Sequence, residues 1–166
     1  MKLLFLLIWF AVCADQDARC RRVSNWLTFG GALFALIYLL STGASWLDVP
    51  MAQVGWGVAV ALVLTLPGYA LNRLGAGDVK LLVALALASG HLYILGTFIG
   101  AGVASLAWLG ARQKIWPLLA QGVSNRYPNL APQTSSKQPF VPFLFVGFAV
   151  MALWLHTSHC PLYLCT

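Results

Sequence analysis

Asp17 and Asp78 are the two residues whose type and setting best suit catalysis. The chain has only four acidic residues (Asp15, Asp17, Asp48 and Asp78), and 60% of it is hydrophobic. An ionised carboxylate at membrane depth is costly, so a functional role is the first hypothesis for such a group. Two carboxylates that lie close together share a proton, because both cannot ionise cheaply. One can then take a proton from water while the other donates a hydrogen bond to a peptide carbonyl. The pair therefore suits hydrolysis of a peptide bond without a metal, a cofactor or a nucleophilic side chain.

The setting of Asp78 is the segment Gly75-Ala76-Gly77-Asp78, which leads into an apolar run. Because they lack a Cβ atom, Gly75 and Gly77 let a peptide backbone approach and permit unusual backbone angles before a helix. The competing interpretation is structural, since an Asp at this place can cap the helix that follows. The segment alone does not separate the two interpretations.

Composition indicates a polytopic membrane protein that forms one domain over residues 1–166. The mean hydropathy is +0.81, and only 8% of the residues are charged. Long apolar runs separated by short polar breaks are typical of membrane-spanning chains, and continuous rather than alternating runs favour helices. The net charge of +6 is confined to a few breaks between the runs. This distribution sets topology in a lipid bilayer and does not form a nucleic-acid-binding stripe.

Six apolar segments predict an all-α fold with about six transmembrane helices. They cover residues 1–20, 26–40, 54–71, 79–88, 92–109 and 139–155. The first also resembles a signal peptide, but its extension to Cys20 gives the length that a span needs. Pro67 is expected to kink or break the third helix. Gly96 and Gly100 have the spacing of a close-packed helix face.

The connecting segments are the basic break at 19–25, residues 41–53, the glycine-rich break 72–78, a tight break at 89–91, the long polar segment 112–138 and the tail 156–166. Lys and Arg number three, zero, two, zero and four in the successive breaks and zero in the tail. The positive-inside rule then places the first, third and fifth breaks in the cytoplasm and both termini outside. Lys2 is the one exception to this pattern.

This orientation brings Asp17 and Asp78 to the same side of the membrane. Asp17 ends the first span and Asp78 lies at the third break, whereas Asp48 belongs to the opposite side. Asp15 and Asp17 are about 200° apart around a helix, so only one of them can face a given site.

Other catalytic or metal-binding arrangements are poorly represented. The cysteines form no Cys-x-x-Cys pair, and no Ser stands in a Gly-x-Ser-x-Gly elbow. His156 and His159 with Cys160 are an alternative metal site in the tail, on the side opposite to Asp17 and Asp78. Cys160 and Cys165 either form a disulfide there or remain free thiols. We therefore expect no metal in the site.

Three segments together resemble the type IV prepilin peptidases, a family of Gly-x-Gly-Asp membrane aspartic proteases. Asp17 followed by residues 21–28 resembles the first active-site segment, in which an Asp is followed eight residues later by an Asn or Asp. Residues 75–81 resemble the Gly-x-Gly-Asp segment, and residues 139–143 with Gly147 are similar to a Pro-Phe-x-Pro motif in the last span.

The resemblance implies an aspartic endopeptidase that cuts the short basic leaders of prepilins and pseudopilins. It implies a site at the cytoplasmic face of the bacterial inner membrane, with Asp17 and Asp78 as the catalytic acids. Asn25 and Lys80 also fall on motif positions. From the residues, Asn25 is expected to cap the second span, and Lys80 either sets topology or helps to place Asp78 or the substrate carbonyl. Ser24 departs from the family, which usually has Pro there.

The larger members of that family carry a four-cysteine cytoplasmic domain and methylate the new N-terminus. Such a domain does not fit between Asp17 and Trp26, so this chain resembles the short form that serves Flp-type pili, and we expect cleavage without methylation. The competing hypothesis is a non-enzymatic membrane protein, either a transporter subunit or a pilus-assembly scaffold, that uses the acids as a proton relay.

Overall fold

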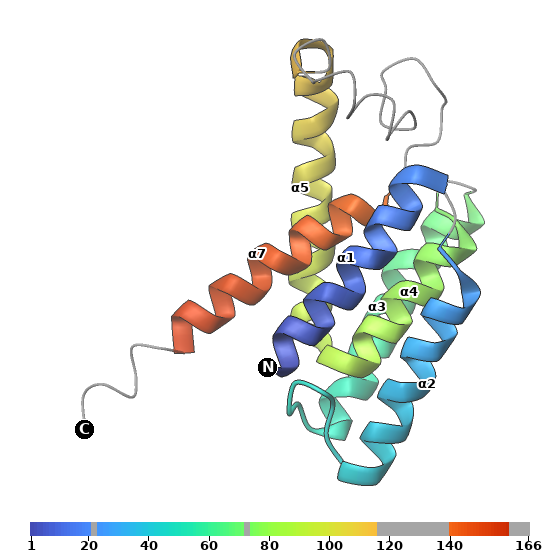
Figure 1. The fold of residues 1–166 in the computed structure, drawn as a ribbon, viewed down its shortest axis with the longest axis vertical. Coiled ribbons are helices and arrows are strands. Elements are labelled where there is room, and N and C mark those ends of the chain that lie inside the picture. Colours follow the sequence, from blue (N-terminus) through green and yellow to red (C-terminus); the bar gives the residue numbers. More distant parts are fainter. Residues whose placement is uncertain (21–22, 72–73, 116–139, 160–166) are drawn as a thin grey trace.

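The computed structural model describes residues 1–20, 23–71, 74–115 and 140–159, and helices dominate these ranges. The six helices are α1 (Lys2–Cys20), α2 (Asn25–Thr42), α3 (Met51–Ala70), α4 (Ala76–Ser89), α5 (His91–Ile115) and α7 (Val141–His159). In Figure 1, α1 to α4 form a bundle, α5 runs beyond the upper end of this bundle, and α7 crosses α5 obliquely. The expectation of an all-helical chain is confirmed for the described residues.

The short helix α4 lies at the centre of this bundle. It packs against α2, α3 and α5, and Leu81, Leu82 and Leu85 are fully buried. Its 14 residues span about 21 Å, which is less than the roughly 30 Å of a bilayer core. A helix that is apolar on all sides and shielded by its neighbours is typical of the interior of a bundle.

Three helices are long and apolar enough to cross a membrane: Asn25–Thr42, Met51–Ala70 and His91–Ala111. The apolar stretch Val141–Thr157 is shorter. Large apolar side chains such as Trp56, Val63 and Leu106 are about two-thirds exposed, at 70%, 69% and 70%. Such an apolar outer surface suits contact with lipid chains. A membrane protein is therefore supported, and the number of six spans stays a prediction.

One predicted helix start needs correction, and one predicted break is absent. Pro67 does not break α3, which continues through it to Ala70, next to the predicted end at residue 71, and a kink at Pro67 stays a prediction. α4 begins at Ala76 rather than at residue 79, so Gly77 and Asp78 belong to the helix and not to the preceding loop. The tight break before α5 is present, with Gly90 at a φ of 105° that favours glycine.

The last two helices also extend beyond their predicted limits. α5 runs on to Ile115, six residues past the expected end, because the polar residues after position 109 continue the helical backbone. α7 begins at Val141 and includes His156, which was expected in the tail. Cys160 and Cys165, for which a disulfide and free thiols were both open, lie outside the described residues.

Glycines bring α5 and α7 into close contact. A Cβ atom at Gly100 would come within 2.6 Å of the Cα of Gly147, and one at Gly147 within 2.7 Å of the Ala101 nitrogen. Gly96 faces the Met151 side chain in the same interface. The predicted close-packed face of Gly96 and Gly100 is confirmed, and α7 supplies its partner.

Candidate active site

Asp17 lies in the last turns of α1, on the face that enters the protein interior. Its side chain shares this face with Leu6, Phe10 and Cys13, and Asp17 is only 7% exposed. The Val141 N–H, at the first residue of α7, donates a hydrogen bond of 3.1 Å to the Asp17 Oδ2 atom. A buried carboxylate requires such a donor, because burial without a hydrogen bond is costly.

Asp78 is the third residue of α4. The Gly75 N–H donates to the Asp78 Oδ2 atom at 3.0 Å, which is the return bond of a capping box. The structural interpretation of Asp78 as a helix cap is thus correct. It does not exclude a functional role, because the bond engages one of the two carboxylate oxygens.

The fold brings the two acids together from helices that are remote in sequence. Asp17 lies in the last turns of α1 and Asp78 in the first turn of α4. The end of α1 and the starts of α4 and α7 lie at the same end of the bundle (Figure 1). The partial positive charges at the starts of α4 and α7 favour negative charge at this place. The result is a half-buried acid pair at one end of a helical membrane bundle.

Asp15 is placed differently from Asp17. Its Oδ2 atom forms an ion pair of 2.8 Å with Arg19, and the two side chains are 40% and 38% exposed. An exposed pair four residues apart on one helix is an ordinary surface interaction. Asp15 therefore lies on the outside of α1, while Asp17 enters the bundle.

The two glycines before Asp78 do not adopt unusual backbone angles. Gly75 has a φ of −80° and a ψ of 153°, which any residue adopts, and Gly77 lies within the helix without a positive φ. The expectation of special angles is therefore wrong. A Cβ atom at Gly77 would meet nothing within 4 Å, so there is open space beside Gly77, next to Asp78.

The two supporting polar residues occupy positions away from the acid pair. Ser24, not Asn25, is the N-cap of α2, and Asn25 is the exposed first residue of that helix. The expected cap is off by one residue because the helix begins earlier than position 26. The Lys80 ammonium lies 4.7 Å from the centre of the Phe29 ring in α2, a cation–π contact. Lys80 follows Asp78 by two residues, so the two side chains point to different sides of α4.

Val141 is the site residue that the sequence interpretation did not single out. Val141 belongs to residues 139–143, the segment similar to a Pro-Phe-x-Pro motif, but that similarity does not assign a role to the Val141 N–H. The available signal was Pro142, because a proline near the start of a helix marks the turn whose N–H groups lack helical partners.

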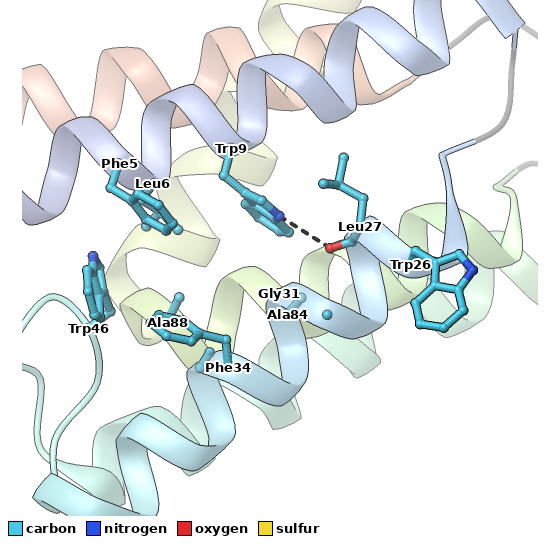
Figure 2. A pocket seen from close by; sticks show the side chains of 12 residues that line it. Phe5, Leu6, Trp9, Trp26, Leu27, Gly31, Phe34, Trp46, Ala84 and Ala88 are labelled. Carbon is cyan, nitrogen blue, oxygen red and sulfur yellow. Dashed lines mark hydrogen bonds between the residues drawn. The ribbon is translucent and has the colours of Figure 1, made fainter.

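A separate apolar groove of about 280 Å³ lies between α1 and α2, with Ala84 and Ala88 of α4 at its base. In Figure 2 the Trp9 indole points across this groove, and its N–H donates to the Leu27 carbonyl oxygen at 3.3 Å. None of the residues that line the groove is acidic. Asp17 and Asp78 are therefore not part of this groove.

The alternative metal site in the tail receives no support from the described residues. Among them, no three His, Cys, Asp or Glu side chains gather in a way that would hold a metal ion. Cys160, the third member of that alternative, lies outside the described residues.

The fold and the site together define a helical membrane protein with a half-buried pair of carboxylates. Residues 4–110 match the model of the type IV leader peptidase family. The chain belongs to this family, and the matched range contains both Asp17 and Asp78. Searches of curated proteins and of solved structures found no match.

Proposed function

We propose that the protein is a membrane-embedded aspartic endopeptidase that removes the basic leader of type IV prepilins or pseudopilins. The observation that carries this proposal is the placement of Asp17 and Asp78 at one end of the bundle, where a main-chain N–H donates to each carboxylate. Membership of the type IV leader peptidase family supports a protease. Leader peptidases of this kind need a site at the membrane edge, where a soluble leader meets an apolar helix.

In the proposed reaction one carboxylate of the pair is ionised and the other is protonated. The ionised group takes a proton from a water molecule, whose oxygen attacks the scissile carbonyl carbon. The protonated group donates a hydrogen bond to the carbonyl oxygen as negative charge develops there. Collapse of the tetrahedral intermediate breaks the C–N bond, and the leaving amine takes up a proton from the pair. The pair then returns to its starting state, with one proton shared between two oxygens.

The open space at Gly77 gives a path for the substrate backbone. Apart from the chain neighbours of Gly77 and the backbone of its own helix, no atom lies within 4 Å of the position that a Cβ would occupy there. An extended peptide that enters on this side comes directly alongside the first turn of α4, where Asp78 is located. We propose that Gly77 keeps this approach free.

Charge supports a cytoplasmic location for the site. Nine of the ten Lys and Arg residues lie in the breaks that share a side with Asp17 and Asp78, which is the cytoplasmic side by the positive-inside rule. The substrates we propose are prepilins of the Flp type, cleaved without methylation of the new N-terminus.

The test is co-expression with a candidate Flp-type prepilin, with leader removal followed as a gel shift. We expect cleavage by the wild type and its loss in Asp17→Asn and in Asp78→Asn. A positioned acid or base contributes about 10²- to 10⁴-fold to rate. Asp15→Asn is the matched control, because Asp15 lies on the same helix but on its exposed side.

Two results would contradict the proposal. If both single Asn variants cleave as the wild type does, the acid pair is not catalytic. If the wild type leaves every prepilin of a panel intact, the chain acts as a membrane scaffold or transporter subunit and not as a peptidase.

A further inference from the structure

The first turn of α7 directs a single main-chain donor at Asp17. A helix start leaves several N–H groups without a partner inside the helix. In α7 the second residue is Pro142, which has no N–H. The N–H groups of Phe143 and Leu144 both donate to the Phe140 carbonyl oxygen, at 3.1 Å and 3.2 Å. The Val141 N–H is therefore the donor of this turn that reaches out of the helix.

That donor meets Asp17 in a dry environment. Val141 and Leu144 are fully buried and Asp17 is 7% exposed, and 124 positions separate Val141 from Asp17 in sequence. A hydrogen bond from a main-chain N–H to a carboxylate is stronger than one between neutral groups, and water does not compete for it here. The partial positive charge of the helix start adds to the attraction.

Packing on two sides fixes the position of this turn. On one side, the α5–α7 crossing at Gly100 and Gly147 leaves no room for a side chain. On the other, the Phe10 ring of α1 lies 5.9 Å from that of Phe145 and 5.6 Å from that of Phe148. α7 is thus held against both α5 and α1, and its start cannot move away from Asp17 without disturbing these contacts.

We infer that the Val141 N–H is a positioning group that orients the Asp17 carboxylate toward Asp78, and that Pro142 keeps this turn free of a second outward donor. The inference rests on the proposed peptidase function, because it concerns the geometry of the same acid pair. One Asp17 oxygen is held by α7, and this bond restricts the rotation of the carboxylate. Catalytic groups that are held within a fraction of an ångström react faster than groups that must be ordered during the reaction.

Val141→Pro tests the inference directly, because it removes the N–H, and it also replaces the buried valine side chain. Proline is well tolerated at the first position of a helix, where its fixed φ suits the backbone. Val141→Ala is the matched control, since it shortens the same buried side chain and keeps the N–H. Purified proteins in detergent would be assayed on a prepilin that the wild type cleaves.

We expect kcat of Val141→Pro to fall roughly 10- to 100-fold, the scale of a misplaced catalytic group, with an unchanged KM. In Val141→Ala we expect kcat close to that of the wild type. A parallel loss in both variants would overturn the inference in favour of side-chain packing. Cleavage by Val141→Pro at the wild-type rate would overturn it outright.

A thermal double-mutant cycle measures the same contact without relying on activity. Val141→Pro is compared in the wild type and in an Asp17→Ala background by the shift in Tm. If the N–H acts through Asp17, its removal lowers Tm in the wild type and has a smaller effect once the carboxylate is absent. Equal shifts in the two backgrounds would show that the two groups do not interact and would overturn the inference.

The two experiments separate this inference from the proposed function. Cleavage that requires Asp17 and Asp78 but not the Val141 N–H overturns only the positioning role. Absence of cleavage by the wild type overturns the peptidase function, and with it the catalytic purpose of the contact.

Discussion

The two ends of the helical bundle hold their acidic residues in opposite ways. At one end Asp48 is 70% exposed and forms an ion pair of 2.6 Å with Lys2, the first residue of α1. At the other end, Val141 and Gly75 donate main-chain N–H groups to Asp17 and Asp78. The first arrangement joins two flexible side chains in water, whereas the second ties two carboxylates to the rigid starts of helices.

This difference separates a surface contact from a candidate catalytic one. An exposed ion pair contributes little to stability, because in water each charge is about as well solvated alone as it is stabilised by its partner. Carboxylates fixed by helix starts keep their positions and orientation, and two of them held side by side share a proton. The same ion pair also accounts for Lys2 as the one exception to the positive-inside count. Lys2 lies beside Asp48, the acidic residue at the same end of the bundle.

The largest expected effect is the loss of cleavage in Asp78→Asn compared with Asp48→Asn. The Asn keeps an oxygen that accepts from Gly75, so the helix cap is retained while proton transfer is lost. We expect cleavage to fall by at least about 100-fold in Asp78→Asn, as measured by prepilin processing, and to be unchanged in Asp48→Asn. Equal activity of the two variants would remove the functional distinction between the two ends.

The next effect concerns the crossing that places α7 over Asp17. Gly147→Ala would push a methyl group into the backbone of α5 at Ala101. Overpacking of this kind costs about 1–3 kcal/mol, and we expect a lower Tm in detergent together with slower cleavage. Gly102→Ala in α5 is the control, because a Cβ there meets nothing within 4 Å. A Gly147→Ala variant as stable and active as the wild type would contradict the tight crossing.

Gly77→Ala should affect cleavage without affecting the fold. Space for the methyl group is available, and Ala is at least as favourable as Gly in a helix. We expect an unchanged or higher Tm and a cleavage rate that falls about tenfold, the result of a misplaced substrate. Gly55→Ala in α3 meets the same open surroundings; we expect the same unchanged or higher Tm and an unchanged cleavage rate. Full activity of Gly77→Ala would show that the substrate does not approach along this side.

The smallest effect on cleavage and Tm is expected at the end of the bundle that contains Lys2 and Asp48. Lys2→Met removes the partner of Asp48 and should change neither the cleavage rate nor the Tm measurably, because exposed ion pairs contribute little. A clear drop in cleavage would indicate that the two ends of the bundle are coupled.

Local patterns in the sequence were sufficient to predict the helical class, and they single out the two acids as candidates. Continuous apolar runs predict helices because a backbone in lipid must satisfy its own hydrogen bonds, and the counts of Lys and Arg place Asp17 and Asp78 on one side. Helix boundaries were less accurate. α4 begins at Ala76 and not at residue 79, and α5 continues to Ile115, because packing against neighbouring helices outweighs the local preferences of single residues.

What only the tertiary structure decided is how the acids are held. The choice of Ser24 over Asn25 as the cap of α2 and the contact of Lys80 with Phe29 depend on the neighbouring helices. The bond from Val141 to Asp17 joins residues 124 positions apart, and no local pattern specifies such a pair. The sequence by itself determined which groups are candidates for the chemistry, because residue type and charge are local properties. The crossing of α7 over α5 and α1 decided their orientation, because it depends on packing among helices that only the folded chain brings together.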